Sequence, residues 1–62
     1  MLTEQQLNIL RLISRGLTNK EMAEQCFVTP ETVKTHIKHI YMKLDVHNRF
    51  QAIQRAKELR LL

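Results

Sequence analysis

The segment from Thr32 to Leu44 contains several basic residues and no acidic residue. Lys34 and Lys38 are four residues apart, so in a helix both amines project from one face, about one turn from each other. Thr35 follows Lys34 and adds a hydroxyl and a methyl group to that face. Cationic side chains of one sign on an exposed helix suit a polyanionic partner.

Histidines in the same region raise the alternative of a metal site. His36 and His39 are three residues apart, while Cys26 and His47 lie elsewhere in the chain. A zinc site usually needs four converging ligands, whereas the two close histidines lie about 60° apart on a solvated flank. The carboxylates that a metal-dependent nuclease would need are missing near them. The sequence therefore predicts no metal, no cofactor and no catalytic residue.

The composition bounds the size and class of the protein. Its 62 residues allow one domain, which is predicted to span residues 1–62. A chain of this length buries only about 60% of the surface that its unfolded form exposes, so an internal active site is not expected. Ten Lys and Arg against six Asp and Glu give a net charge of +4. The pI near 9.7 favours nucleic acid or an anionic membrane surface as partner.

Cysteine usage and hydropathy bear on the location of the protein. Cys26 is the only cysteine, which excludes an intrachain disulfide and favours a reducing compartment. No apolar run approaches the roughly 20 residues of a membrane span, and no signal-peptide pattern opens the chain. We therefore expect a cytoplasmic protein without a membrane partner.

The secondary structure is predicted to be entirely helical. β-Branched residues never alternate over the length of a strand, whereas N-cap residues precede four amphipathic segments. Thr3 and Thr18 are each followed three residues later by Gln or Glu, the spacing of a capping box. Thr29 precedes Pro30, and Asn48 is a fourth N-cap. The expected helices are about Glu4–Arg15, Asn19–Cys26, Pro30–Leu44 and Arg49–Leu59.

The connections between these helices are short. Gly16 lies just after the first helix, where a left-handed residue would end it. Only Phe27–Thr29 join the second and third helices, which fits a sharp helix-turn-helix corner, although the Gly that usually occurs there is absent. The apolar stripe of the third helix, expected to face the core, consists of Val33, Ile37, Ile40 and Leu44. We therefore expect an all-α, four-helix bundle-like domain that contains a helix-turn-helix.

A helix-turn-helix whose second helix is basic fits the major groove of B-DNA. The groove is about 12 Å wide and admits one helix, whose N-terminal half reaches base edges. Lys34 and Lys38 can donate to guanine O6 and N7, and the methyl group of Thr35 can meet a thymine methyl. Helix N-termini present N–H groups to phosphates. The candidates for such backbone contacts are Thr18, Asn19, Lys20 and Thr32.

Four blocks of sequence carry a family resemblance: Leu2-Thr3, Gly16–Ala23, Val28–Ile37 and Lys43–Ala52. In this order and spacing they resemble the DNA-binding domain of LuxR/FixJ-type (GerE-type) bacterial transcription regulators, over essentially Leu2 to Leu61. The stretch Lys34–Leu44, with Arg49 and Ala52, is also similar to the large MalT-like activators.

The resemblance implies a four-helix domain in a longer regulator, with the last helix as a dimer contact. It implies double-stranded DNA as partner, a homodimer on DNA, an upstream regulatory domain, and RNA polymerase as a further partner. The base contacts would be Lys34, Thr35 and Lys38. Further backbone contacts would come from His36 and Lys43, beside Asn19, Lys20 and Thr32. The dimer interface would include Gln51, Gln54, Arg55 and Glu58.

This sequence departs from the family pattern at Gln6, Cys26, Phe50 and Arg60, where the family usually has an acidic residue, Leu, a small or β-branched residue, and often Gly. Phe50 and Arg60 flank the fourth helix, so they affect the expected dimer contact more than DNA binding. Glu21 either completes a capping box alone or also reaches Arg49. The sequence leaves both roles open.

Two other functions stay open beside DNA binding. The region of sigma factors that reads the −35 promoter element shares the Leu-Thr opening and the Thr-Val-Lys helix start. It normally lacks the fourth helix that Val46–Ala52 marks here. A helical protein-interaction module whose basic face meets an acidic protein is the second alternative. A duplex-binding test would separate that module from a DNA reader.

Overall fold

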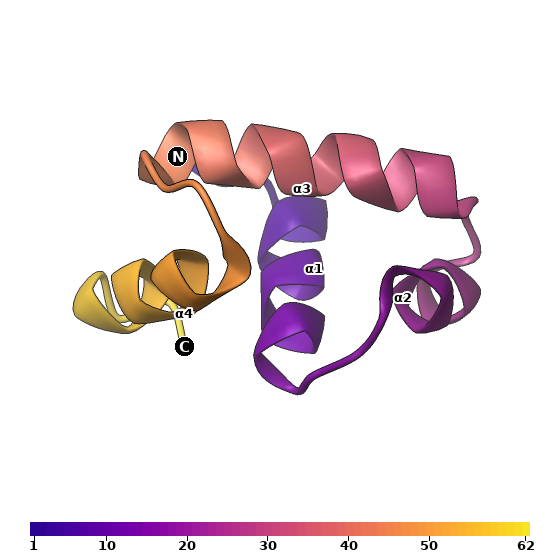
Figure 1. Cartoon of the computed structure of the whole chain (residues 1–62), viewed down its shortest axis with the longest axis horizontal. Coiled ribbons are helices and arrows are strands. Elements are labelled where there is room, and N and C mark those ends of the chain that lie inside the picture. Colours follow the sequence, from indigo (N-terminus) through magenta and orange to yellow (C-terminus); the bar gives the residue numbers. More distant parts are fainter.

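The computed structural model describes residues 1–62 and contains four α-helices and no strand (Figure 1). They are α1 (Glu4–Ser14), α2 (Asn19–Cys26), α3 (Pro30–Leu44) and α4 (Arg49–Glu58). The prediction of an all-α domain with four helices is confirmed. The predicted ends at Arg15 and Leu59 lie one residue too far, because these two residues are the C-caps.

Each helix begins at the N-cap that the sequence predicts. The side-chain oxygens of Thr3, Thr18, Thr29 and Asn48 each accept a hydrogen bond from the N–H three residues on, at 2.8–3.2 Å. Thr3 and Thr18 complete capping boxes, because Gln6 and Glu21 accept in return from the N-cap backbone N–H groups. Local hydrogen bonding therefore fixes where the helices start.

Every helix is followed by a residue in the left-handed region: Gly16, Phe27, Asp45 and Arg60, with φ of 86°, 57°, 57° and 58°. In each case the next N–H donates to a carbonyl five residues back, at 2.8–3.3 Å, which is the Schellman pattern. Phe27 fills the helix-turn-helix corner where Gly is usual. A side chain at positive φ costs free energy that Gly does not. The sharp turn thus forms without Gly and carries backbone strain.

The core lies around α1, which is central in Figure 1 with α3 across one end and α2 and α4 on either side. α1 contributes Ile9, Leu10, Leu12 and Ile13, and α3 contributes Val33, Ile40 and Leu44. Ile37, predicted in the core stripe, is half-buried and packs at its edge. The two fully buried residues of α4 are alanines, Ala52 and Ala56. No helix of the chain has the length and hydrophobicity of a membrane span.

Arg49 joins the start of α4 to the end of α1. Its guanidinium donates to the carbonyls of Ile13 and Leu17, at 3.1 and 2.5 Å. Glu21 instead accepts from the Thr18 N–H at 2.8 Å, so the capping box is its role in the fold. Hydrogen bonds from Thr18 hold the pKa of Glu21 below its ordinary value of 4.5. Arg49 therefore takes backbone carbonyls, not Glu21, as its partners.

Candidate nucleic-acid interface

The outward face of α3 carries the three predicted base-contacting residues on one exposed stripe. Lys34, Thr35 and Lys38 are all exposed, opposite the buried Val33 and Ile40. The spacing of four residues between Lys34 and Lys38 separates their Cα atoms by about 6 Å along the helix axis. The side chain of Lys34 keeps 64% of its surface accessible. These amines are free to meet a ligand without any rearrangement of the core.

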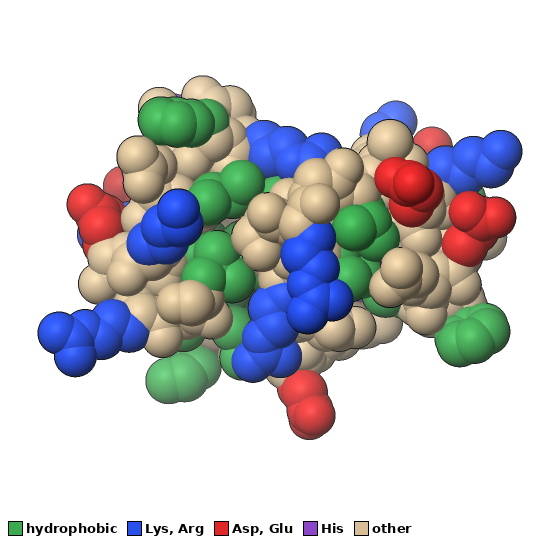
Figure 2. All heavy atoms as spheres, turned by 90° about the horizontal axis from the view of Figure 1, so that it is seen from below, with side chains coloured by type: hydrophobic (Ala, Val, Ile, Leu, Met, Phe, Trp, Pro, Cys, Tyr) green, Lys and Arg blue, Asp and Glu red, His purple; other side chains and the backbone are tan.

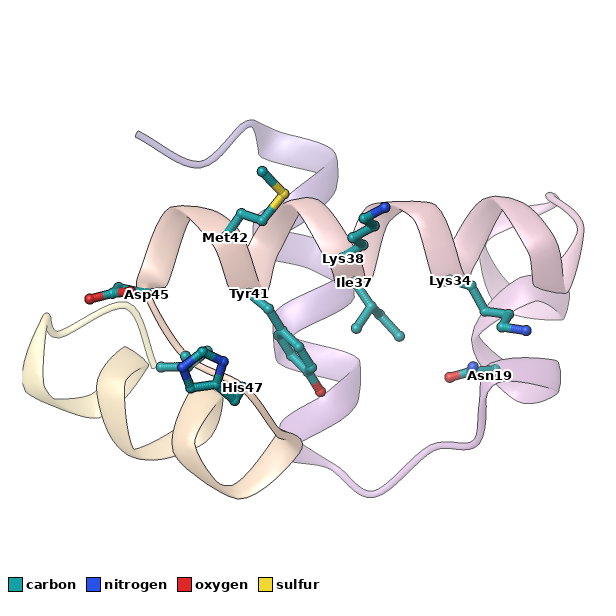
Figure 3. A pocket seen from close by; sticks show the side chains of 9 residues that line it. Asn19, Lys34, Ile37, Lys38, Tyr41, Met42, Asp45 and His47 are labelled. Carbon is teal, nitrogen blue, oxygen red and sulfur yellow. The ribbon is translucent and has the colours of Figure 1, made fainter.

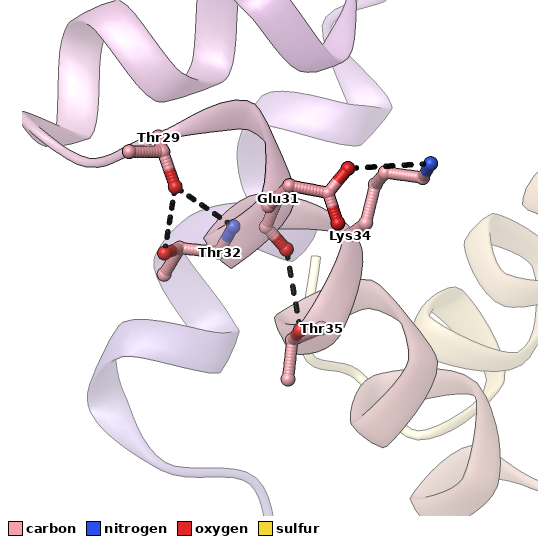
Figure 4. A network of polar contacts seen from close by, with 5 residues as sticks. All are labelled: Thr29, Glu31, Thr32, Lys34 and Thr35. Carbon is pink, nitrogen blue, oxygen red and sulfur yellow. Dashed lines mark hydrogen bonds and ion pairs between the residues drawn. The ribbon is translucent and has the colours of Figure 1, made fainter.

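A network of hydrogen bonds orders the start of α3 (Figure 4). The Thr29 hydroxyl accepts from the Thr32 N–H at 3.2 Å and lies 3.0 Å from the Thr32 hydroxyl. Thr35 donates its hydroxyl proton to the Glu31 carbonyl at 3.2 Å. This bond uses the hydroxyl proton of Thr35, so an outside partner can meet its methyl group or donate a hydrogen bond to its oxygen. The contact to a thymine methyl stays a prediction.

A shallow groove of about 730 Å³ follows the same side of α3 (Figure 3). It brings Asn19 of α2 together with Lys34 and Lys38 of α3, although 15 residues separate Asn19 from Lys34. Asp45 and His47 lie at its other end. The Asp45 carboxylate and the C-terminal carbonyls of α3 make that end unfavourable for a phosphate. The cationic end of the groove is thus the N-terminal half of α3.

The start of α2 offers two unpaired backbone donors. The capping box uses the N–H groups of Thr18 and Glu21. No hydrogen bond occupies those of Asn19 and Lys20, and Lys20 is exposed. N–H groups at a helix start bind anions because the helix dipole is positive there. Thr18 caps this end of α2, and its backbone N–H already donates to Glu21.

Three predicted backbone contacts are less available than the others. Thr32 and His36 are half-buried, and the hydroxyl of Thr32 is part of the cap. The Lys43 amine donates to the Met1 carbonyl at 3.1 Å and to Gln6 Oε1 at 3.0 Å. Lys43 therefore ties the end of α3 to the start of α1. Two of the three ammonium N–H donors are used in this way, so the third is left for a phosphate.

The outer face of α4 holds the predicted dimer residues, Gln51, Gln54, Arg55 and Glu58, all of them exposed. Arg55 and Glu58 pair with each other at 3.5 Å, and Gln51 accepts from the His47 N–H at 2.9 Å. The ring of Phe50 is 71% exposed beside them. Together these residues line a second shallow depression. This face is therefore mixed in charge and includes one large apolar group.

The side of the molecule away from α3 carries charges of both signs, with a group of basic side chains near its middle (Figure 2). Figure 2 shows Lys and Arg there among Asp, Glu and apolar side chains. On α3, in contrast, Glu31 is the single acidic residue. The sequence motifs assign no role to Glu31. Its spacing of three, four and seven residues from Lys34, Thr35 and Lys38 is the signal that places it on their face.

A short helix, a three-residue turn and a longer helix with an exposed cationic face define the class of the protein, a helix-turn-helix domain of a DNA-binding transcription regulator. The chain belongs to the luxR family of bacterial regulatory proteins, which matches residues 1–56. This is a family of regulators and not of enzymes. The resemblance to LuxR/GerE-type domains is thereby confirmed, while the finer similarity to MalT-like activators stays a prediction.

Relatives in this family include response regulators. The chain is 57% identical to the transcriptional regulatory protein LiaR of Bacillus subtilis over 51 residues, 82% of this chain and 24% of LiaR. It is 47% identical to the response regulator protein VraR of Staphylococcus aureus over 53 residues, 86% of this chain and 25% of VraR. The crystal structure of the response regulator ChrA, from a heme-sensing two-component system, matches the whole chain with a TM-score of 0.96 and 42% identity. The chain spans 31% of ChrA and about a quarter of LiaR and VraR.

Proposed function

We propose that this domain reads a specific DNA sequence by placing the N-terminal half of α3 in the major groove. The observation that carries the proposal is the exposed stripe of Lys34, Thr35 and Lys38, opposite the fully buried Val33 and Ile40. Lys34 and Lys38 donate to guanine O6 and N7, and Thr35 places its methyl group against a thymine methyl. The domain does no chemistry on the DNA.

The phosphate contacts come mainly from the start of α2. The free N–H groups of Asn19 and Lys20, with the Lys20 amine, bind a phosphate at the groove edge while Lys34 and Lys38 enter the groove. Thr18 and Thr32 add backbone contacts beside these N–H groups, and His36 adds one on the flank of α3 away from the groove. Lys43 joins them through its third ammonium N–H, while the other two donate to Met1 and Gln6.

The working unit on DNA is a homodimer that pairs through α4. The exposed Gln51, Gln54, Arg55 and Glu58 supply its polar contacts. Residues 1–62 form one domain of a longer cytoplasmic regulator, in which an upstream regulatory domain controls pairing and RNA polymerase is a partner. The relatives support this, since the chain matches only a part of each response regulator.

Selection of bound sites from random duplex DNA tests the proposal, followed by anisotropy titration of the selected duplex at several salt concentrations. We expect an enriched motif with half-sites roughly 10 base pairs apart and a steep fall of affinity with salt. Lys57→Ala removes an exposed positive charge on α4 and is the charge-matched control for a substitution of Lys38 on α3. Salt-sensitive binding without an enriched motif would favour the protein-interaction module instead.

A further inference from the structure

Glu31 is the one carboxylate on the face of α3 that we propose enters the major groove. At about 100° per residue it lies near the centre of the stripe formed by Lys34, Thr35 and Lys38. It occupies the first turn of α3, and its side chain is 87% exposed. If α3 enters the groove by its N-terminal half, this carboxylate approaches the base pairs together with the two lysines.

The contacts of Glu31 leave its carboxylate available for a ligand. Oε1 lies 3.7 Å from the Lys34 amine, which is longer than a direct charge-assisted hydrogen bond of about 2.7–2.9 Å. An exposed ion pair of this kind contributes little to stability. In Figure 4 the carboxylate and the amine lie next to each other on the exterior of the helix. The fold thus presents a hydrogen-bond acceptor beside a donor.

A carboxylate can only accept hydrogen bonds at neutral pH, and this limits what it can meet on DNA. Phosphates, guanine and the polar edge of thymine present acceptors, which a carboxylate avoids. Cytosine presents the N4 amine, a donor, to the major groove, and adenine presents a donor next to the N7 acceptor. A lysine three residues on from Glu31 matches guanine. Cytosine beside guanine is therefore the sequence that suits this acceptor–donor pair.

We propose that Glu31 is a specificity-determining residue that accepts a hydrogen bond from cytosine N4, at a base pair next to the one that Lys34 reads. The inference rests on the proposed function, since it requires α3 in the major groove. A glutamate that only supports the helix start would act differently. It would change the stability of α3, or the affinity for all duplexes alike, without changing the base preference.

The test compares the duplexes selected by the unaltered protein, by Glu31→Gln and by Glu31→Ala. Glu24→Gln is the matched control, because Glu24 is an exposed acid on α2 and lies outside the stripe. Gln pairs with adenine through N6 and N7, so Glu31→Gln is expected to move one position per half-site from cytosine toward adenine. Anisotropy with four duplexes that differ at that base pair then gives the preference for cytosine. We expect roughly 5- to 150-fold for the unaltered protein and little preference for Glu31→Ala.

The outcomes distinguish a failure of the Glu31 contact from a failure of sequence-specific DNA binding. A change confined to one base position, with Glu24→Gln unchanged, supports the role of Glu31. If both Glu31 variants select the original motif and only bind every duplex more tightly, Glu31 merely repels phosphates and the inference is overturned while the DNA reader stands. If the unaltered protein selects no motif, the proposed function fails, and the inference fails with it. Thermal melting of each variant confirms that the helix is intact.

Discussion

The outer faces of α3 and α4 differ in charge and in how each helix is attached to the core. After Glu31, the outer face of α3 carries only positive and neutral side chains, whereas on α4 Arg55 and Glu58 neutralise each other at 3.5 Å. α3 is anchored by the fully buried Val33 and Ile40. The anchors of α4 are two buried alanines, the half-buried Ile53 and the Arg49 guanidinium. The two exposed faces therefore suit different partners.

An unbalanced cationic face attracts a polyanion over a distance, because its potential is not cancelled locally. A face of mixed charge with an exposed Phe50 attracts a partner mainly at contact, through shape and apolar area. This is why DNA is the partner proposed for α3 and a second copy the partner proposed for α4. The small residues beneath α4 allow it to pack closely on α1, but they bury little apolar area.

The largest expected effect comes from the anchoring side chains. Ile40→Ala removes a fully buried group under α3 and should lower the free energy of unfolding by about 2–5 kcal/mol. Ala56→Gly, the corresponding change under α4, should cost only about 1 kcal/mol. Urea denaturation followed by circular dichroism measures both. Equal losses for the two variants would contradict the difference in anchoring.

Lys38→Ala tests whether the cationic face of α3 contributes to DNA binding. We expect a loss of about 1–3 kcal/mol in affinity for the selected site, because one base contact disappears. Arg55→Ala on α4 should leave binding to a single half-site unchanged, since the Arg55 charge is already paired. Anisotropy with half-site and full-site duplexes distinguishes these cases. An equal effect of both variants on the half-site would mean that charge alone, and not position on α3, governs binding.

Arg49→Met tests the polar attachment of α4. The variant keeps an apolar stem but loses two charge-assisted hydrogen bonds to Ile13 and Leu17, so we expect stability to fall by about 1.5–3 kcal/mol. Amide exchange should rise more in α4 than in α3. Arg55→Met is the control, because Arg55 is exposed. An equal rise of amide exchange in all helices would show that the attachment of α4 to the core is not separable from that of α3.

Phe27→Gly should stabilise the turn that positions α3. The ring is 94% exposed and its φ is 57°, so Gly relieves strain and loses almost no packing. The greater freedom of Gly in the unfolded chain offsets part of the gain, which leaves a net stabilisation of about 0.5 kcal/mol. The melting temperature should rise by a few degrees. A lower melting temperature would show that Phe27 makes a stabilising contact.

The smallest effect is the pH dependence of the α2 cap. The pKa of Glu21 is lowered in the folded state by the hydrogen bonds from Thr18, so its ionised form stabilises the fold. That contribution is present above the ordinary value of 4.5 and is lost as the pH falls through the lower folded-state pKa. Thermal melting of Glu21→Gln against the original chain should show a difference at pH 7 that shrinks toward pH 3. A difference in melting temperature that does not change with pH would contradict the stabilising role of the ionised Glu21.

The sequence alone is enough to predict where each helix begins, because each N-cap bonds to an N–H only three residues away and needs no distant partner. It also determined the exposed lysine stripe of α3, since one helical period separates apolar from basic positions. It missed the left-handed turn at Phe27, where the closure of a short connection overrides the preference for Gly. Short-range sequence patterns are therefore enough to predict the four-helix fold and the residues of the candidate interface.

The hydrogen-bond partners of the long polar side chains depend on the tertiary structure. Arg49 bonds to carbonyls 32 and 36 residues earlier, and Lys43 to acceptors 37 and 42 residues earlier. These partners are brought into reach by the packing of α1 against α3 and α4, which no short-range pattern encodes. The same packing sets Asn19 beside Lys34 in one groove. A flexible side chain reaches any acceptor that packing brings near, so its partner is a property of the whole fold.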